Sequence, residues 1–269
     1  MDEIGLPDGR TAQLWFGGAD AGPAVLVCHG TPDTRWVART GETAARGAGV
    51  RLLGVNRPGY GTSTATDSTP ASVAADTIAV LDRLGVDRVA VLGMSVGGRY
   101  AAGLAAAHPD RVVALGLVAT PRPDPGGAEP DRAEFEAWAA SMAVADPDDQ
   151  AVATRWLDGQ PPRDAALLGG ALGVTGVAAS AREALAQPDG YLRDATVLCS
   201  DWGYRPEAIG VPTHLWFGAD DGRNPPATGE WWAARVPAAT LVVRPGTTHL
   251  ATLLANWPDI LATMAGYLD

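Results

Sequence analysis

The sequence contains no lysine: its 20 basic side chains, histidine aside, are all arginine. This absence excludes enzymes that form a Schiff base through a lysine, and it excludes the nucleotide-binding P-loop, whose lysine contacts the phosphates. Histidine is also scarce, with 4 residues in a chain of 269. The imidazole candidates for a general base are therefore limited to His29, His108, His214 and His249.

Cysteine and positive charge are both in short supply. Cys28 and Cys199 have no metal-binding or redox spacing, and the apolar run around Cys28 predicts a small buried thiol. The net charge of −11 gives no basic surface for nucleic acid and disfavours an anionic membrane. We expect a neutral small-molecule substrate, with neither nucleic acid nor a membrane as a partner.

The chain also lacks the sequence pattern of a signal peptide. Its first ten residues, MDEIGLPDGR, are acidic and polar rather than basic and then apolar, so we expect a cytoplasmic location. The longest apolar stretch, residues 89–107, is interrupted by glycines and by Arg99. This interruption favours a buried strand followed by a buried helix over a membrane span.

Short apolar runs indicate the strands of a sheet. Runs without polar alternation are typical of strands that are covered on both faces. Helix-length, alanine-rich segments such as 70–84 and 99–108 separate the first four runs, which predicts an α/β fold with a doubly wound, mostly parallel sheet. Residues 11–17 are predicted to add an antiparallel edge strand. The six runs are 24–30, 51–56, 89–95, 112–120, 213–220 and 239–246.

The alternation of strands and helices stops after Thr120. A segment rich in proline, glycine and aspartate, residues 121–131, opens a long region of amphipathic helical pieces. Strand patterns resume at Val211. We predict one α/β core formed by residues 1–120 and 211–269, with residues 121–210 as a helical insertion.

A candidate nucleophile lies at the end of the third run. Residues 93–97, GMSVG, fit the pattern G-x-S-x-G, in which small neighbours permit a strained turn that exposes the serine hydroxyl. The motif follows a predicted strand and opens a predicted helix, as this turn requires. We predict that Ser95 is a nucleophile.

A serine hydroxyl needs an imidazole to take its proton and a third group to orient that imidazole. His249 follows the last predicted strand, at the carboxyl edge of the sheet, and is the best candidate for the base. We expect His108 to end a helix, His214 to lie at the far edge of the sheet, and His29 to hold a loop by hydrogen bonding.

The acid is expected between serine and histidine in chain order. Asp220 and Asp221 directly follow the strand that begins at Thr213, and we favour Asp221. An acid near Asp124 and a turn-forming role for the aspartate pair are the alternatives. Across the site, the backbone amides of Thr31 and of Val96 are predicted to form an oxyanion hole.

These motifs together resemble the α/β-hydrolase superfamily. The motifs are HGTP (29–32), NRPGYG (56–61), GMSVGG (93–98), GADDGRNPP (218–226) and PGTTHL (245–250). The resemblance covers nearly the whole chain and implies an α/β-hydrolase fold, with the insertion acting as a helical cap. It implies a serine hydrolase that needs no metal or organic cofactor. Asp221 matches the acid of the family's G-x-x-D loop, which supports it over Asp220.

Two departures from the family's pattern bear on the site. Asn56 stands where the family usually has an acid, so an ion pair that anchors the loop is replaced by a neutral hydrogen bond. Threonines precede His249 where a glycine or another polar residue is common. The serine at position 95 argues against the branches that use an aspartate nucleophile, the haloalkane dehalogenases and epoxide hydrolases.

The predicted activity is hydrolysis of a neutral ester, thioester or lactone through an acyl-enzyme. The same triad would serve C–C bond hydrolysis or cofactor-free perhydrolysis, and a noncatalytic ligand-binding protein is the third interpretation. Met94, beside the nucleophile, is predicted to line the pocket, together with the aromatic side chains of Trp36 and Trp202. Trp138, Trp156 and Tyr204 are further candidates for its walls.

Overall fold

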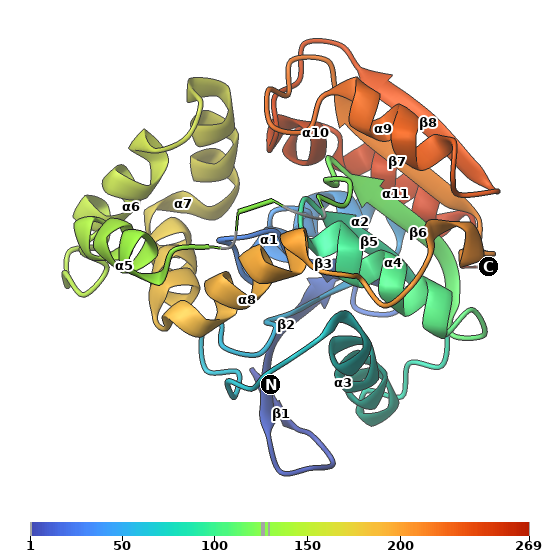
Figure 1. Cartoon of the computed structure of the whole chain (residues 1–269), viewed down its shortest axis with the longest axis horizontal. Coiled ribbons are helices and arrows are strands. Elements are labelled where there is room, and N and C mark those ends of the chain that lie inside the picture. The colour runs from blue at the N-terminus through green and yellow to red at the C-terminus, as the bar shows by residue number, and fades with distance from the viewer. Residues whose placement is uncertain (1, 125–126, 129, 269) are drawn as a thin grey trace.

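Each of the six predicted apolar runs forms a strand in the computed structural model, and all six belong to one eight-stranded sheet (Figure 1). The structure describes residues 2–124, 127, 128 and 130–268. Residues 125, 126 and 129 of the predicted hinge, and the first and last residues of the predicted core, lie outside this description.

The sheet is mixed, with parallel strands from β4 onward in the order β1-β2-β4-β3-β5-β6-β7-β8. β2 pairs antiparallel with β4, and β1 pairs antiparallel with β2. Residues 11–17 therefore form the predicted antiparallel strand, but the prediction that they form the edge was wrong, because the three-residue strand β1, which is too short to show an alternating pattern, pairs with the outer side of β2. The strands are β1 (Glu3–Gly5), β2 (Thr11–Gly18), β3 (Ala24–Cys28), β4 (Arg51–Val55), β5 (Val89–Met94), β6 (Val112–Val118), β7 (Thr213–Gly218) and β8 (Ala239–Arg244).

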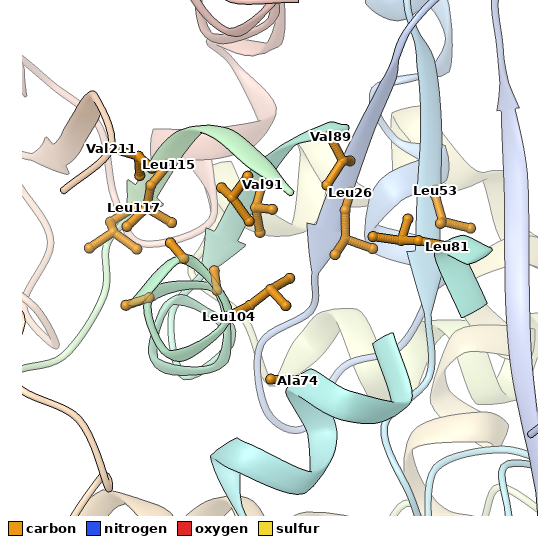
Figure 2. Close-up of a cluster of buried hydrophobic side chains, with 14 of the residues drawn as sticks. Leu26, Leu53, Ala74, Leu81, Val89, Val91, Leu104, Leu115, Leu117 and Val211 are labelled. Atoms are coloured by element: carbon orange, nitrogen blue, oxygen red, sulfur yellow. The ribbon is translucent and has the colours of Figure 1, made fainter. Parts of the chain in front are cut away.

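Helices cover both faces of the sheet, as a doubly wound fold requires. One apolar cluster joins the strands to α3, α4 and α9, and Figure 2 shows part of it between the sheet and the first two of these helices. A second cluster on the opposite face includes residues of α1, α2, α10 and α11. The helices are α1 (Trp36–Arg39), α2 (Glu42–Ala48), α3 (Pro70–Arg83), α4 (Gly97–Ala107), α9 (Pro226–Ala233), α10 (Ala251–Leu254) and α11 (Trp257–Ala265).

Among its described residues, the segment between β6 and β7 contains four α-helices and the short 3-10 helix Pro206–Ala208, and Figure 1 places the first three α-helices to one side of the core. They enclose an apolar cluster of their own around Phe135, Trp156 and Val177. The four α-helices are α5 (Arg132–Ser141), α6 (Asp149–Asp158), α7 (Pro162–Leu185) and α8 (Pro188–Cys199).

By length and composition alone, α7 could cross a membrane: it has 24 residues and a window of mean hydropathy 1.3. The core helix of a soluble protein passes the same test. α7 is also broken at Gly173, where φ is 66° and ψ is 175°. Each half is only about 12 residues, or about 18 Å, whereas a bilayer core is about 30 Å thick. The broken helix is therefore not a regular membrane-spanning segment.

Because strands β3 to β8 run parallel, their carboxyl ends meet at one edge of the sheet. The loops that follow β3, β5, β7 and β8 carry Thr31, Ser95, Asp221 and His249, respectively. The fold thus brings four segments that are far apart in the sequence to a single edge, where doubly wound proteins bind their ligands.

Candidate active site

Ser95 lies at the sharp turn between β5 and α4. Its φ angle of 53° is in the left-handed region that a non-glycine residue rarely adopts, and its amide donates to the carbonyl of Val118 at 2.8 Å. The glycines of the motif allow close backbone contacts: a Cβ at Gly97 would lie 2.2 Å from the Cys28 carbonyl oxygen, and one at Gly93 would lie 2.4 Å from the Gly98 Cα. The G-x-S-x-G pattern is therefore a packing requirement at this turn.

His249 and Asp221 form a hydrogen-bonded pair at the ends of neighbouring strands. His249 Nδ1 lies 2.7 Å from Asp221 Oδ2, and the other carboxylate oxygen accepts the amides of Arg223 at 2.8 Å and Asn224 at 3.0 Å. Burial raises the pKa of Asp221, but the hydrogen bonds from His249 and from these amides outweigh it and lower the pKa below the ordinary value. The carboxylate therefore stays ionised beside the imidazole.

A cavity of about 250 Å³ joins this pair to the serine. Ser95 and His249 both line it, with Thr31 from the loop after β3 and Met94 from the end of β5. The opposite wall comes from the insertion, so the pocket lies between the sheet edge and α5 to α7. The insertion's lining residues are Trp138, Met142, Trp156, Gly159, Gln160, Leu168 and Ser180.

Thr31 lines the cavity and Val96 directly follows Ser95, and the oxyanion hole formed by their backbone amides stays a prediction. Val96 is the N-cap residue of the 11-residue helix α4, so its amide lies at the positive end of a helix dipole. Thr31 belongs to the loop after β3. Within the described residues, neither amide donates to another backbone or side-chain group. Both are thus free to donate to a bound oxygen.

His29 is buried and holds the loop before Thr31, as the sequence analysis predicted. Its ring bonds to the Gly30 carbonyl through Nδ1 at 2.9 Å, and its Nε2 accepts the amide of Arg57 at 3.3 Å. Burial, with the Arg57 guanidinium, lowers the pKa of His29 well below the ordinary value. Because Nε2 must accept a hydrogen bond, the neutral imidazole is the form that fits this position.

A buried charge network behind this loop was missed by the sequence analysis. Arg57 donates to the carbonyl oxygens of His29 at 2.6 Å and of Gly30 at 2.8 Å, and it pairs with Asp194 of α8 at 2.5 Å. Tyr60 and Tyr100 donate to the same carboxylate at 2.6 and 2.8 Å. The sequence signal for Asp194 was a charged residue on the buried face of α8.

The network orients the Thr31 amide. In a trans peptide the carbonyl and the next N–H point in opposite directions. Because the Gly30 carbonyl accepts a hydrogen bond from the buried Arg57, the N–H of Thr31 points away from Arg57. The Thr31 hydroxyl, which lies 2.6 Å from Tyr60 Oη, fixes the same residue from its side chain.

Replacing Asp194 with alanine is expected to lower the free energy of unfolding by about 3–5 kcal/mol, because it leaves the Arg57 charge buried without its partner. Urea denaturation of wild type and Asp194→Ala measures this loss. The control is Asp110→Ala, at an exposed position, which should change stability by no more than about 0.5 kcal/mol. Equal stability of Asp194→Ala and wild type would show that the network adds nothing to the fold.

A second insertion carboxylate holds the loop of the candidate base. Asp164 of α7 is fully buried and accepts hydrogen bonds from the Thr248 hydroxyl at 2.5 Å and from the Ala251 amide at 2.8 Å. These two residues flank His249 on either side. The position of the imidazole thus depends on α7 as well as on the sheet.

A third insertion carboxylate, Glu183, contacts the asparagine at position 56. Glu183 pairs with Arg35 at 2.8 Å and accepts a hydrogen bond from Asn56 Nδ2 at 3.0 Å. Asn56 also accepts the Arg35 amide at 2.6 Å. Asn56 therefore forms hydrogen bonds in place of an acid, as expected, and a separate ion pair between Arg35 and Glu183 of α7 lies beside it.

The other two histidines are away from the cavity. His108 is the C-cap residue of α4. His214 lies in β7, where its Nε2 is 2.9 Å from the Tyr267 hydroxyl. Neither lines the cavity that contains Ser95.

The predictions for Trp36 and Trp202 are corrected by the structure, because neither side chain lines that cavity. Trp202 stacks on Trp232 in the core, and its ring centre lies 3.9 Å from the Arg99 guanidinium carbon. Arg99 in turn donates hydrogen bonds to the carbonyls of Arg122 and Val197 in the insertion. Burial lowers the pKa of Arg99 to about 10.

Trp36 packs against the apolar cluster of the insertion, with the Arg39 guanidinium 5.0 Å from its ring. Tyr204, a further candidate, donates to the Arg99 carbonyl in the core. Of the aromatic candidates, Trp138 and Trp156 line the cavity.

These features define a class of proteins: a doubly wound sheet carries a strained serine turn and a histidine–aspartate pair at its carboxyl edge. The chain belongs to the alpha/beta hydrolase fold family, whose sequence model matches residues 23–255.

Comparisons with individual proteins agree with this family. The chain is 32% identical over 262 residues to pimeloyl-(acyl-carrier protein) methyl ester esterase of Chromobacterium violaceum, covering 92% of this chain and 95% of that protein. It is 37% identical over 99 residues to an epoxide hydrolase of Caballeronia sordidicola, covering 35% of this chain and 30% of that protein. A solved structure of a hydrolase from Pseudomonas aeruginosa PA01 is similar with a TM-score of 0.68 at 25% identity, covering 97% of this chain and 95% of that one.

Proposed function

We propose that the protein is a serine hydrolase that cleaves an ester, thioester or lactone of a small to medium-sized substrate through an acyl-enzyme. The observation that carries the proposal is the hydrogen bond of 2.7 Å between His249 Nδ1 and Asp221 Oδ2, beside a cavity that His249 shares with Ser95. A serine at a strained turn next to an oriented imidazole is the arrangement that activates a weak nucleophile.

In the first half-reaction, the Ser95 Oγ attacks the substrate carbonyl and His249 accepts its proton. Because Nδ1 is engaged by Asp221, Nε2 is the nitrogen that takes the proton. The ionised Asp221 stabilises the imidazolium that forms. His249 then returns the proton to the leaving alcohol or thiol, and the acyl group stays on Ser95.

The negative oxygen of the tetrahedral intermediate would be bound by the amides of Thr31 and Val96. Their orientation by Arg57 and by the start of α4, respectively, supports this role. Donors that are fixed in advance contribute about 2.7–4 kcal/mol each to such reactions. In the second half-reaction, a water loses its proton to His249 and attacks the acyl carbon, which releases the acid and regenerates Ser95.

The relatives' names point to two reactions, and Ser95 favours one of them. The Chromobacterium violaceum relative is an esterase over nearly the full length of both chains, whereas the Caballeronia sordidicola epoxide hydrolase matches over 99 residues. Epoxide hydrolases belong to the branches that use an aspartate nucleophile, and this chain has a serine at that position. Ester hydrolysis is therefore the better-supported activity.

We propose further that residues 121–210 act as a cap over the pocket. The aromatic and aliphatic side chains that α5 to α7 contribute to the cavity support this role. A small-molecule substrate would be enclosed between the cap and the sheet edge.

Labelling with a fluorophosphonate probe tests the proposed nucleophile. We expect stoichiometric modification of wild type at Ser95, located by mass spectrometry of the labelled peptide. His249→Ala should label more slowly by about 100- to 10,000-fold, because the general base is lost.

His108→Ala is the matched control, since His108 lies at the end of α4 outside the cavity, and it should label at the wild-type rate. A folded wild-type protein that does not react, or one that reacts at a residue other than Ser95, would contradict the proposed function.

A further inference from the structure

The active-site cavity contains one carboxylate that the proposed reaction does not use. Asp33 lines the cavity with Ser95 and His249. A Cβ built on Gly30 would lie 3.5 Å from the Ser95 Cβ and 3.9 Å from the Asp33 Cβ, so the two side chains begin on the same part of the cavity wall. Asp33 is thus close enough to contact a substrate that is bound to Ser95.

The Asp33 carboxylate is not balanced by a cation. Its hydrogen bond of 2.7 Å comes from the amide of the next residue, Thr34. Within the part of the chain that the structure describes, no arginine or histidine forms an ion pair with it. Arg57 is committed to Asp194 and to the loop carbonyls. A carboxylate in such a site gains from a ligand that brings positive charge.

The surroundings of Asp33 include four further ionisable side chains, one of which is Arg57, paired with Asp194. His249 and Arg223 line the same cavity, and Asp221 lies behind His249. Arg223 is exposed on the loop after β7, where solvent screens its charge. The insertion contributes only uncharged side chains to the cavity wall. A substrate in the cavity therefore meets one acid, Asp33, one exposed arginine and His249, with uncharged side chains around them.

We propose that Asp33 is a specificity-determining residue whose carboxylate binds a cationic amine or ammonium group of the substrate. The inference rests on the proposed ester hydrolysis and narrows its substrate class. The favoured esters carry a positive charge a few bonds from the scissile carbonyl, and esters with a carboxylate at that place are disfavoured. This refines the expectation of a neutral substrate that the composition alone suggested.

The protonation of Asp33 makes this preference depend on pH. Burial raises the pKa of Asp33 to about 7, although hydrogen bonding from the Thr34 amide and the charge of Arg57 act in the opposite direction. Below that pH the side chain is neutral and loses its attraction for a cation. The preference for cationic esters is therefore weak at pH 6 and strong at pH 8.

The test compares esters of equal shape that differ in charge. The first pair is acetylcholine and 3,3-dimethylbutyl acetate, which differ in the charge of the alcohol. The second pair is the p-nitrophenyl esters of 4-(trimethylammonio)butyrate and 5,5-dimethylhexanoate, which differ in the charge of the acyl group. The measured quantity is the ratio of kcat/KM for the cationic ester to kcat/KM for its neutral partner. Both members of a pair need the same nucleophile and base, so the ratio isolates the charge preference.

Asp33→Asn should lower this ratio by roughly 10- to 100-fold at pH 8 in at least one pair, which is the range for hydrogen bonds and contacts to a charged group. The ratio should rise between pH 6 and pH 8 in wild type and stay flat in Asp33→Asn. Asp20→Asn removes the same charge from an exposed site between β2 and β3 and should keep the wild-type ratio and its pH dependence. Asp33→Ser serves as a second variant, and thermal melting confirms that each variant is folded.

The outcomes separate this inference from the proposed function. Hydrolysis of the neutral esters with the same ratio in wild type and Asp33→Asn would overturn the role of Asp33 and leave the serine hydrolase intact. Failure of wild type to cleave any of the four esters, together with no fluorophosphonate labelling, would overturn both.

Discussion

Ser95→Ala is expected to lower kcat for ester hydrolysis by about 10⁵- to 10⁶-fold, comparable to the loss of the nucleophile in other serine hydrolases. Alanine removes the oxygen that forms the acyl-enzyme, and no other hydroxyl replaces it at the turn after β5. The cavity and the amides of Thr31 and Val96 would remain. Substrate binding should therefore change far less than kcat, and the residual rate should come from oxyanion stabilisation alone.

The measurement is steady-state hydrolysis of a p-nitrophenyl ester, with the concentration of folded Ser95→Ala determined by absorbance and that of wild-type active sites by fluorophosphonate titration. Ser72→Ala is the control, since Ser72 caps the start of α3 and lies outside the cavity. It should keep full activity. If Ser95→Ala retained most of the wild-type rate, another residue would have to be the nucleophile.

Asp221→Asn is expected to lower kcat by about 10⁴-fold while leaving the fold intact. The asparagine oxygen can still accept the amides of Arg223 and Asn224, so the loop after β7 should keep its shape. Its amide nitrogen, however, donates where the carboxylate accepted the bond from His249 Nδ1. The imidazole is then held in the wrong tautomer, and Nε2 can no longer take a proton from Ser95.

Asp220→Asn provides the matched control for this prediction. Asp220 is the neighbouring acid, and its side chain is exposed. Its backbone amide, rather than its carboxylate, donates to the Thr247 carbonyl. It should keep kcat within a few-fold of wild type. A larger loss in Asp220→Asn than in Asp221→Asn would reverse the assignment of the acid.

The sequence predicted the core strands well because a buried parallel strand is a local property. Each of β3 to β7 is a mostly buried apolar run that can be recognised without knowing its neighbours, whereas β8, at the partly exposed edge, was recognised from its apolar residues alone. Ser95 and its glycines could be found for a similar reason, since the turn imposes small residues at fixed positions within one short segment. The edge strand β1 was missed because three residues carry no pattern.

The supporting acids of the site could not be found in this way. Asp194, Asp164 and Glu183 lie in amphipathic helices, where an acid is usually exposed to solvent. Their burial arises only when the insertion packs on the core and Arg57, the His249 loop and Arg35 meet them. The misplaced tryptophans have the same cause: Trp202 packs on Arg99, and the sequence does not show which side of the chain the cavity will occupy.

The three insertion carboxylates have a consequence for how this fold can be altered. Asp194 joins the insertion to the residues after β4, through Arg57 and Tyr60; Asp164 joins it to the loop around His249; and Glu183 joins it to Arg35, between β3 and α1. The insertion is thus not an interchangeable module that merely shapes the substrate pocket. A chimera that exchanges residues 121–210 for the corresponding segment of another family member would preserve the catalytic loops only if the new segment carried acids at the same three places.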